Sequence, residues 1–262
     1  MSSAHIIVCT ASKEHNSFGY TDTFALLTLE CARRDIALSI ARCGTPGMLQ
    51  HARNVIFVEA CASRATYAFW WDSDIAFEPA GLFDVLDRVT PGVAIARPYP
   101  ARDVNMQLLR QALLDWQGGT PTEADLWKMG SRWVCELDFV DGEPIWREGL
   151  VRLRVAGFGW CVMLVEDMRR MLCQAHAMAH FDRSALDKLP HDWLSRPHTH
   201  LFDSLQQGEL GAPTTEADDW SFWTRWRASD RELWAASDRE IVNGPRAGKY
   251  IDYLKRHALL AR

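Results

Sequence analysis

The sequence predicts an α/β domain whose sheet is mostly parallel and flanked by helices. In the first hundred residues, short apolar runs alternate with segments whose apolar residues recur at helical spacing, and this alternation is typical of a parallel sheet covered by helices. The chain of 262 residues is long enough for one domain with a sizeable core, and its 48% hydrophobic content is ordinary for a soluble protein. We therefore expect a single domain over residues 1–262, with a mixed arrangement of strands in its second half.

The first half is expected to contain four strands and three helices. The strands are predicted at 5–10, 36–40, 66–71 and 93–97, where apolar, β-branched and aromatic residues concentrate. The first helix is expected to begin at Thr21 or Asp22, because both are good capping residues. The second is expected at 47–63, and the third at 79–89 with a proline in its first turn.

The second half combines strands and helices with longer irregular stretches. Between 98 and 144 only a helix near 105–116 is predicted, because the tryptophans there are scattered among turns and charged residues. Strands predicted at 151–156 and 161–165 flank the turn Gly157-Phe158-Gly159, where the missing side chains would let the backbone approach a ligand closely. The remaining predicted elements are helices at 167–180 and 215–226, strands at 233–235 and 240–242, and a tail at 244–262.

Two carboxylates follow the most apolar of the predicted strands, in the tripeptide Asp72-Ser73-Asp74. On an extended backbone, residues two apart project to the same side, so both carboxylates can converge on one divalent cation. Hard oxygen ligands suit magnesium or manganese, which commonly also hold a substrate diphosphate. By itself the tripeptide favours an Asx-rich turn that caps the helix begun by Pro79, and it is only a weak signal of a metal site.

Charge and composition narrow the class of protein. The formal net charge of -5 argues against a surface that binds a polyanion everywhere, although the tail forms a local basic segment, with Arg or Lys at 246, 249, 255, 256 and 262 against the single acid Asp252. The seven cysteines include no CxxC pair and are expected to be reduced core residues. No apolar run has the length of a membrane-spanning helix, and the N-terminal segment lacks signal-peptide features, so we expect a cytoplasmic protein without a membrane partner.

Several short motifs follow one another along most of the chain. These are the first strand with Thr10, Ala52-Arg53-Asn54, Asp72-Ser73-Asp74-Ile75, Tyr99-Pro100-Ala101-Arg102, Gly157-Phe158-Gly159, Leu201-Phe202-Asp203, and Asp218-Asp219-Trp220-Ser221-Phe222 followed by Arg225-Trp226. In this order, the motifs resemble the GT-A glycosyltransferases, in particular the small soluble, family-2-like enzymes of bacteria and bacteriophages. The resemblance implies a Rossmann-like GT-A fold, with residues 1–100 as the half that binds a nucleotide-sugar, 101–243 as the acceptor and catalytic half, and 244–262 as a basic tail.

The resemblance also implies roles for individual residues. Asp72 and Asp74 match the pair that holds Mn²⁺ or Mg²⁺ against a nucleotide-sugar, for which a UDP-sugar is the expected donor. Asn243 stands where many members place a histidine as a further metal ligand, and an amide oxygen is a weaker ligand than a charged group. Asp218 and Asp219 match a Glu-Asp pair, and Asp219 takes the place of the catalytic base. The implied donor contacts are Thr10, Ala11, Arg53, Asp72, Ser73 and Gly159.

The function expected from this resemblance is transfer of a sugar from a nucleotide-diphosphate sugar to a hydroxyl acceptor, with inversion. A 5-hydroxymethylpyrimidine in DNA is one candidate acceptor, because the basic tail and the tryptophans next to arginines, as in Arg132-Trp133, could contact phosphates and stack on a base. Glycans and small molecules are the other candidates. Two alternatives stay open: a nucleotidyltransferase, although 11–19 lacks a glycine-rich phosphate loop, and a non-catalytic nucleotide-sugar binder, motivated by Asn243.

Overall fold

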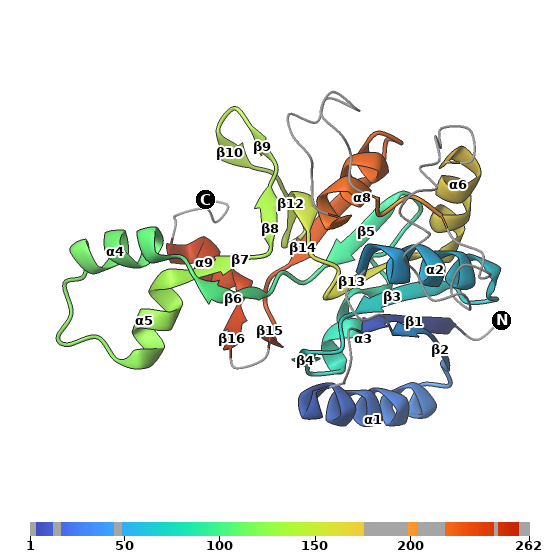
Figure 1. Ribbon diagram of the computed structural model, residues 1–262, viewed down its shortest axis with the longest axis horizontal. Helices are drawn as coiled ribbons and strands as arrows, with labels where there is room; N and C mark the ends of the chain where they lie inside the picture. Colours follow the sequence, from blue (N-terminus) through green and yellow to red (C-terminus); the bar gives the residue numbers. More distant parts are fainter. Residues whose placement is uncertain are drawn as a thin grey trace.

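The computed structural model describes residues 4–12, 17–44, 49–175, 199–203, 218–243 and 246–256, and Figure 1 shows their arrangement. The end of the helix predicted at 167–180, the start of the one predicted at 215–226, and residues 244–245 and 257–262 of the predicted basic tail lie outside these residues. Within the described parts of the chain, no helix combines the length and apolar character needed to cross a membrane.

The predicted order of strands and helices is confirmed at the N-terminus. β1 (His5–Ser12), α1 (Phe18–Arg33), β2 (Ala37–Gly44), α2 (Leu49–Ala62) and β3 (Tyr67–Trp71) follow one another, and β1 pairs in parallel with both β2 and β3. The prediction that α1 begins at Thr21 or Asp22 is wrong. Ser17 is the N-cap, because its side chain accepts a hydrogen bond from the backbone N–H of Tyr20.

One strand interrupts the parallel half. β4 (Ile75–Phe77), α3 (Ala80–Leu86) and β5 (Val93–Ala96) follow β3, but β13 (Trp160–Leu164) lies between β3 and β5 and is antiparallel to both. The principal sheet runs β11-β12-β14-β5-β13-β3-β1-β2, with β8 paired to β12, and is therefore mixed. The expectation of a mostly parallel sheet holds for the pairs of β1 with β2 and with β3 and for the β5–β14 pair. It is wrong for the pairs of β13 with β3 and with β5, which are antiparallel.

Residues 98–144, in which the sequence predicts only one helix, form short strands and two helices. β12 (Leu150–Ala156) pairs on different parts of its length with β8, β14 and β11. Figure 1 shows α4 and α5 extending away from the principal sheet, at the far left of the view. The elements of this stretch are β6 (Pro100–Val104), α4 (Met106–Leu114), α5 (Glu123–Gly130), β7 (Ser131–Trp133), β8 (Cys135–Leu137), β9 (Phe139–Val140), β10 (Glu143–Pro144) and β11 (Trp146–Arg147).

The C-terminal elements complete the sheet and add a small ladder. After β13 come α6 (Val165–Ala175), α8 (Asp218–Arg227), β14 (Glu232–Ala236), β15 (Glu240–Asn243), β16 (Arg246–Lys249) and α9 (Tyr250–Arg256). β15 pairs with both β16 and β4, which brings the end of the chain back to the residues that follow β3. The described part of the predicted basic tail is thus a strand and a helix. Its Arg246 is only 8% exposed and donates to the carbonyls of Ala101 and Asp103, so this arginine is part of the fold.

The principal sheet has a hydrophobic core on each face, as the alternation of side chains along β1 requires. Ile7 and Cys9 belong to the core that includes residues of α2, α6 and α8. Ile6 and Val8 belong to the other core, which includes residues of α1 and α3. Figure 1 shows α1 and α2 on opposite sides of β1 and β3. The sheet is therefore covered on both faces, and the polar residues that follow its strands lie at its edge.

Candidate active site

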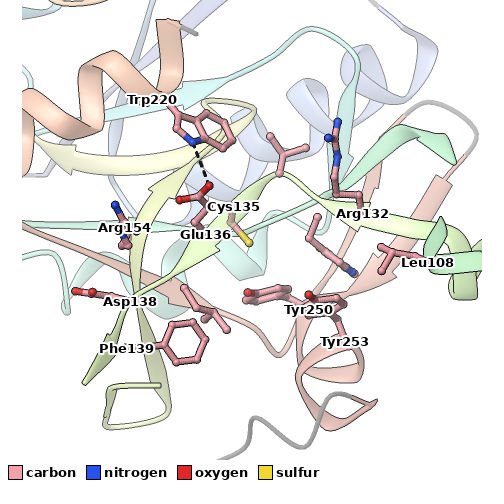
Figure 2. A pocket seen from close by; sticks show the side chains of 13 residues that line it. Leu108, Arg132, Cys135, Glu136, Asp138, Phe139, Arg154, Trp220, Tyr250 and Tyr253 are labelled. Carbon is pink, nitrogen blue, oxygen red and sulfur yellow. Dashed lines mark hydrogen bonds between the residues drawn. The ribbon is translucent and has the colours of Figure 1, made fainter. Parts of the chain in front are cut away.

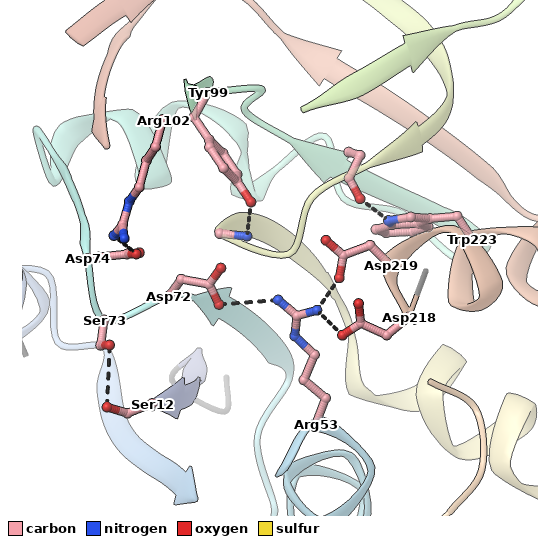
Figure 3. Close-up of polar contacts among 12 residues, drawn as sticks. Ser12, Arg53, Asp72, Ser73, Asp74, Tyr99, Arg102, Asp218, Asp219 and Trp223 are labelled. Carbon is pink, nitrogen blue, oxygen red and sulfur yellow. Dashed lines mark hydrogen bonds and ion pairs between the residues drawn. The ribbon is translucent and has the colours of Figure 1, made fainter. Parts of the chain in front are cut away.

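The tripeptide Asp72-Ser73-Asp74 leaves the carboxyl end of β3 as a turn. Ser73 and Asp74 are turn residues, and the N–H of Ile75 donates to the carbonyl of Asp72 over 3.1 Å. The expectation that an extended backbone points both carboxylates to one side is therefore wrong. The turn directs the two side chains to different partners, Asp72 toward Arg53 and Asp74 toward Arg102 (Figure 3).

Arg53 on α2 brings three of the four predicted carboxylates together. Its Nη1 donates to Asp218 Oδ2 at 2.6 Å and to Asp219 Oδ1, and its Nη2 lies 3.4 Å from Asp72 Oδ1. Arg53 is 2% exposed, and its guanidinium lies 5.4 Å from the centre of the Phe158 ring. Asp72, which follows β3, and Asp218, the first residue of α8, are 146 residues apart in the sequence and meet on one buried cation. We call Arg53, Asp72, Asp218 and Asp219 the Arg53 cluster.

Burial and neighbouring charges shift the pKa values of Asp219 and Arg53. Burial is the largest cause at Asp219; together with the neighbouring Asp218 and Asp72, and against the opposing effect of Arg53, it raises the pKa of Asp219 to about 7. Burial alone would lower the pKa of Arg53, but Asp219, Asp72 and Asp218 outweigh it, and the pKa of Arg53 is raised. Arg53 is therefore always charged, whereas Asp219 changes its protonation state near neutral pH.

A second, more exposed set of polar groups surrounds Asp74. Arg102 on β6 donates to Asp74 Oδ2 and, through Nε, to Asn243 Oδ1 at 3.2 Å. Asn243 reaches this place because β15 pairs with β4, with Asn243 opposite Ile75. Its amide nitrogen donates to the carbonyl of Pro100 at 2.9 Å, which fixes the amide oxygen toward Arg102. We call Asp74, Arg102 and Asn243 the Arg102 cluster.

The oxygens of the Arg102 cluster fit a hard cation. The Asp74 carboxylate and the Asn243 amide oxygen converge on one positive charge, the guanidinium of Arg102, and both are ligands that Mg²⁺ and Mn²⁺ accept. Asp72, the third predicted ligand, is held by Arg53. Among the described residues, no group of three or more His, Cys, Asp or Glu side chains is placed to hold a metal. A metal in this cluster would require Arg102 to move away.

The predicted nucleotide contacts lie at the carboxyl end of β1. Thr10 is fully buried and its hydroxyl lies 2.9 Å from the Tyr20 hydroxyl, so its side chain already has a partner within the protein. Ala11 is buried beside it. Ser73 donates to the hydroxyl of Ser12 at 3.4 Å, which joins the ends of β1 and β3 (Figure 3). Residues 13–16, which follow β1 in the sequence, lie outside the described residues.

The glycine turn before β13 makes room for a tyrosine. A Cβ atom on Gly159 would lie 2.6 Å from ring atoms of Tyr99, and one on Gly157 would overlap the Tyr99 hydroxyl. The N–H of Gly159 donates to that hydroxyl at 3.2 Å, and its carbonyl accepts from the N–H of Asp72 at 3.3 Å. The space left by the missing side chains is thus filled by Tyr99, and the turn supports the residue that begins the Asp72 tripeptide.

The remaining motif of the resemblance, Leu201-Phe202-Asp203, holds α2 in position. Asn54 donates to Asp203 Oδ1 at 2.7 Å and accepts from the N–H of Phe202 at 3.0 Å. Arg225 on α8 donates to the carbonyls of Leu201 and Asp203 at 2.9 and 2.7 Å. The helix that carries Arg53 and the helix that begins with Asp218 are therefore tied to the same short segment.

Sequence reasoning did not foresee the central position of Arg53 or the contact of Tyr99 with the glycine turn. Arg53 was expected only as a weak donor contact, and a signal was available: it is a charged residue among the apolar positions of a predicted helix. Such a residue needs buried partners of opposite charge. For Tyr99, the two glycines indicated a close approach, but their spacing says nothing about which group approaches.

Ten chains among the solved structures match this protein. No protein-family model matches the sequence, and no curated protein matches it. A glycosyltransferase involved in the glycosylation of the major capsid of PBCV-1 is similar over 76% of this chain and 82% of its own, at 10% identity and a TM-score of 0.33. Mouse xyloside xylosyltransferase 1 is similar over 87% of this chain and 82% of its own, at 12% identity and a TM-score of 0.31. Both solved structures are glycosyltransferases, and at these TM-scores the likeness identifies no family.

Proposed function

We propose that this protein is a glycosyltransferase that moves a sugar from a nucleotide-diphosphate sugar, with a UDP-sugar as the expected donor, to a hydroxyl acceptor. The observation that supports it best is the Arg53 cluster. A carboxylate with a pKa near 7, Asp219, lies beside a permanent cation at the edge of an α/β sheet where strands end. An acid whose pKa lies near neutral pH is suited to remove a proton from a substrate.

Asp219 is the proposed general base. In the transfer, the acceptor hydroxyl oxygen bonds to the anomeric carbon of the sugar, and the bond from that carbon to the diphosphate oxygen breaks. The bonding electron pair leaves with the nucleoside diphosphate, and the hydroxyl proton passes to the Asp219 carboxylate. Because attack occurs on the face opposite the leaving group, the sugar inverts its configuration. Arg53 fixes the position of Asp219, and Asp218 shares the same Nη1 of Arg53.

The donor diphosphate is proposed to bind at the Asp72 tripeptide. Asp74 and Asn243 would hold Mn²⁺ or Mg²⁺, with Asp72 next to them, and such an ion when bound neutralises charge on a diphosphate. Arg102 is half exposed, with 55% of its side chain accessible, and would be released toward the phosphates when the ion takes its place. The ends of β1 and β3, with Thr10, Ala11 and Ser73, and Gly159 in the turn before β13, are the proposed surroundings of the nucleotide.

Several arginine and tryptophan side chains that were expected to contact a DNA acceptor have partners within the protein. Arg246 of the basic tail is buried against carbonyls, and Trp226, one of the tryptophans flanked by arginines, is fully buried. Arg147 lies over the Trp234 ring, 4.2 Å from its centre, and pairs with Glu232. These side chains are engaged within the protein, so the proposal names a hydroxyl acceptor and leaves hydroxymethylated DNA as one member of the panel to be tested.

The test is a donor screen that measures nucleotide release from UDP-, GDP-, ADP-, CDP- and dTDP-sugars with glycans, small alcohols and hydroxymethylated DNA as acceptors. We expect release with one nucleotide class, dependence on Mn²⁺ or Mg²⁺, and loss of turnover in Asp74→Ala with the fold intact by circular dichroism. NMR of the product reports the anomeric configuration. In a separate arm that supplies nucleoside triphosphates and sugar 1-phosphates, release of pyrophosphate would identify a nucleotidyltransferase. Donor binding without any turnover would identify a non-catalytic binder.

A further inference from the structure

A cleft of about 830 Å³ lies between the short strands, α8 and α9 (Figure 2). This volume is within the range of about 300–1,000 Å³ typical of pockets for small ligands. Its walls come mainly from β7, β8 and the starts of α8 and α9, with single residues of α4, β9 and β12. The side chains that matter below are Arg132, Trp133, Glu136, Trp220, Tyr250 and Tyr253, and we call this cleft the aromatic pocket.

The aromatic pocket adjoins the Arg53 cluster through two shared pieces of backbone. Trp220, which lines the pocket, directly follows Asp219 on α8. Val134, also in its wall, donates to the carbonyl of Tyr99 at 3.0 Å and accepts from the N–H of Gly157 at 2.9 Å. A ligand in the pocket would therefore lie next to the helix turn that carries Asp219 and to the glycine turn that supports Asp72.

The aromatic side chains of the pocket form a rigid surface. Trp133 lies 5.2 Å from the ring centre of Tyr250 and 6.2 Å from that of Tyr253, and the two tyrosine rings are stacked at 5.5 Å. Gly248 on β16 admits the Trp133 ring, since a Cβ atom there would lie 3.2 Å from it. Large, preorganised aromatic faces suit the C–H face of a sugar ring.

The charged groups around these rings are mixed in sign. Glu136 accepts from the indole N–H of Trp220 at 3.4 Å, and Asp138 pairs with Arg152 at 2.9 Å. Exposed Arg132 and Arg154 lie on the same walls. Because carboxylates and guanidinium groups share these walls, the pocket lacks the uniformly positive surface that binds a phosphate backbone. Together the two kinds of group form hydrogen bonds with the hydroxyls of a neutral polyol.

We infer that the aromatic pocket binds a neutral saccharide as the acceptor, with Tyr253 and its neighbours packing on the sugar ring and Glu136 accepting hydrogen bonds from its hydroxyls. This inference rests on the proposed function for the reaction and names the class of its second substrate. The pocket is lined by residues of α8, α9, β7 and β8, and none of the residues assigned to the donor lines it.

The experiment measures saccharide binding and donor use separately on the full chain. Neutral di- to tetrasaccharides of hexoses and pentoses are titrated calorimetrically into the wild type, Tyr253→Ala and Glu136→Gln. The matched controls are Trp116→Ala, an aromatic residue at the end of α4, and Glu143→Gln on β10, neither of which lines the pocket. We expect both pocket variants to bind the best saccharide at least about tenfold more weakly, about 1.4 kcal/mol, and the controls to bind as the wild type does.

Donor hydrolysis in water, without acceptor, is measured on the same proteins and should not differ among them. In the transfer assay the pocket variants should raise the acceptor KM. Failure of every saccharide to bind, unchanged binding in both pocket variants, or transfer to hydroxymethylated DNA alone would overturn the inference. Saccharide binding that is lost in Tyr253→Ala, in a protein that uses no nucleotide-sugar, would support the pocket and refute glycosyl transfer, so the two failures are distinguishable.

Discussion

Arg53 and Arg102 hold the two carboxylates of the same turn, Asp72 and Asp74, in different surroundings. The side chain of Arg53 is 2% exposed and has three carboxylate partners, whereas that of Arg102 is 55% exposed and has one carboxylate and one amide. A buried ion pair is fixed, because removing one partner leaves an uncompensated charge away from water. An exposed pair contributes little to stability and exchanges partners easily. We therefore expect the contacts of the Arg53 cluster to stay fixed as a framework of the site, and the contacts of Arg102 to exchange when a ligand binds.

The largest effect is expected for Arg53→Met, which removes the cation and leaves Asp72, Asp218 and Asp219 together. We expect a loss of about 3–5 kcal/mol in the free energy of unfolding at pH 7, measured by urea denaturation. The deficit should shrink as the pH falls, because protonation relieves the repulsion among the carboxylates. Arg53→Lys keeps the charge and is the control. If Arg53→Met and the wild type have the same free energy of unfolding, the Arg53 cluster does not stabilise the fold.

The pH dependence of stability tests the same cluster at a single carboxylate. The pKa of Asp219 is about 7 in the folded protein and about 3.9 for an unfolded aspartate, so the folded state binds the proton more tightly. Its contribution to stability is fully present below about pH 4 and is lost as the pH rises through about 7. Asp219→Asn should therefore flatten the fall in stability between these values by up to a few kcal/mol. Parallel stability curves for the two proteins would contradict the raised pKa.

An intermediate effect is expected at the glycine turn that supports Asp72. Gly159→Ala places a methyl group 2.6 Å from ring atoms of Tyr99, a buried residue that cannot easily move. We expect about 1–3 kcal/mol of destabilisation by thermal or urea unfolding, from overpacking. Gly119→Ala is the control, since a Cβ atom there meets nothing within 4 Å. If both variants unfold alike, the turn does not depend on the fit of Tyr99.

The smallest effect on stability is expected for Arg102→Ala. Its partner Asp74 is 38% exposed, so the free energy of unfolding should change by less than about 1 kcal/mol. Under the proposed function, turnover should nevertheless change, because Arg102 would compete with the metal for Asp74 and Asn243 and would contact the donor phosphates. The measurement determines two quantities, the Mn²⁺ concentration for half-maximal nucleotide release and the donor KM, and compares each between Arg102→Ala and the wild type. A destabilisation as large as that of Arg53→Met would erase the distinction between the two clusters.

The order of the N-terminal strands and helices could be predicted from the sequence, because their periodicities are strong and local. The antiparallel direction of β13 could not be, since the apolar run Trp160–Leu164 gives a strand but no direction. The same limit applies to the site. The sequence indicates three acids next to apolar or helical segments, namely Asp72, Asp74 and Asp219. It does not indicate their partners, Arg53 and Arg102, because these come from segments that are distant in the sequence and meet only in the folded protein.

The geometry that the strand pattern predicts for the Asp72 tripeptide is wrong. Side-chain alternation predicted convergence of Asp72 and Asp74, but β3 ends at Trp71 and the chain turns at Ser73 and Asp74. Asn243 was expected near them from the resemblance, and the β15–β4 pairing provides the physical reason, since it sets Asn243 opposite Ile75.

The central claim, that the Arg53 cluster is a site of glycosyl transfer with Asp219 as its base, is tested most directly by the transfer rate of Asp219→Asn with the best donor and acceptor of the panel. The account predicts a rate lower by about 100- to 10,000-fold with the donor KM little changed, and a wild-type rate that rises with pH and levels off above about pH 7. An Asp219→Asn variant that retains most of the wild-type rate, with the same pH dependence, would contradict the account.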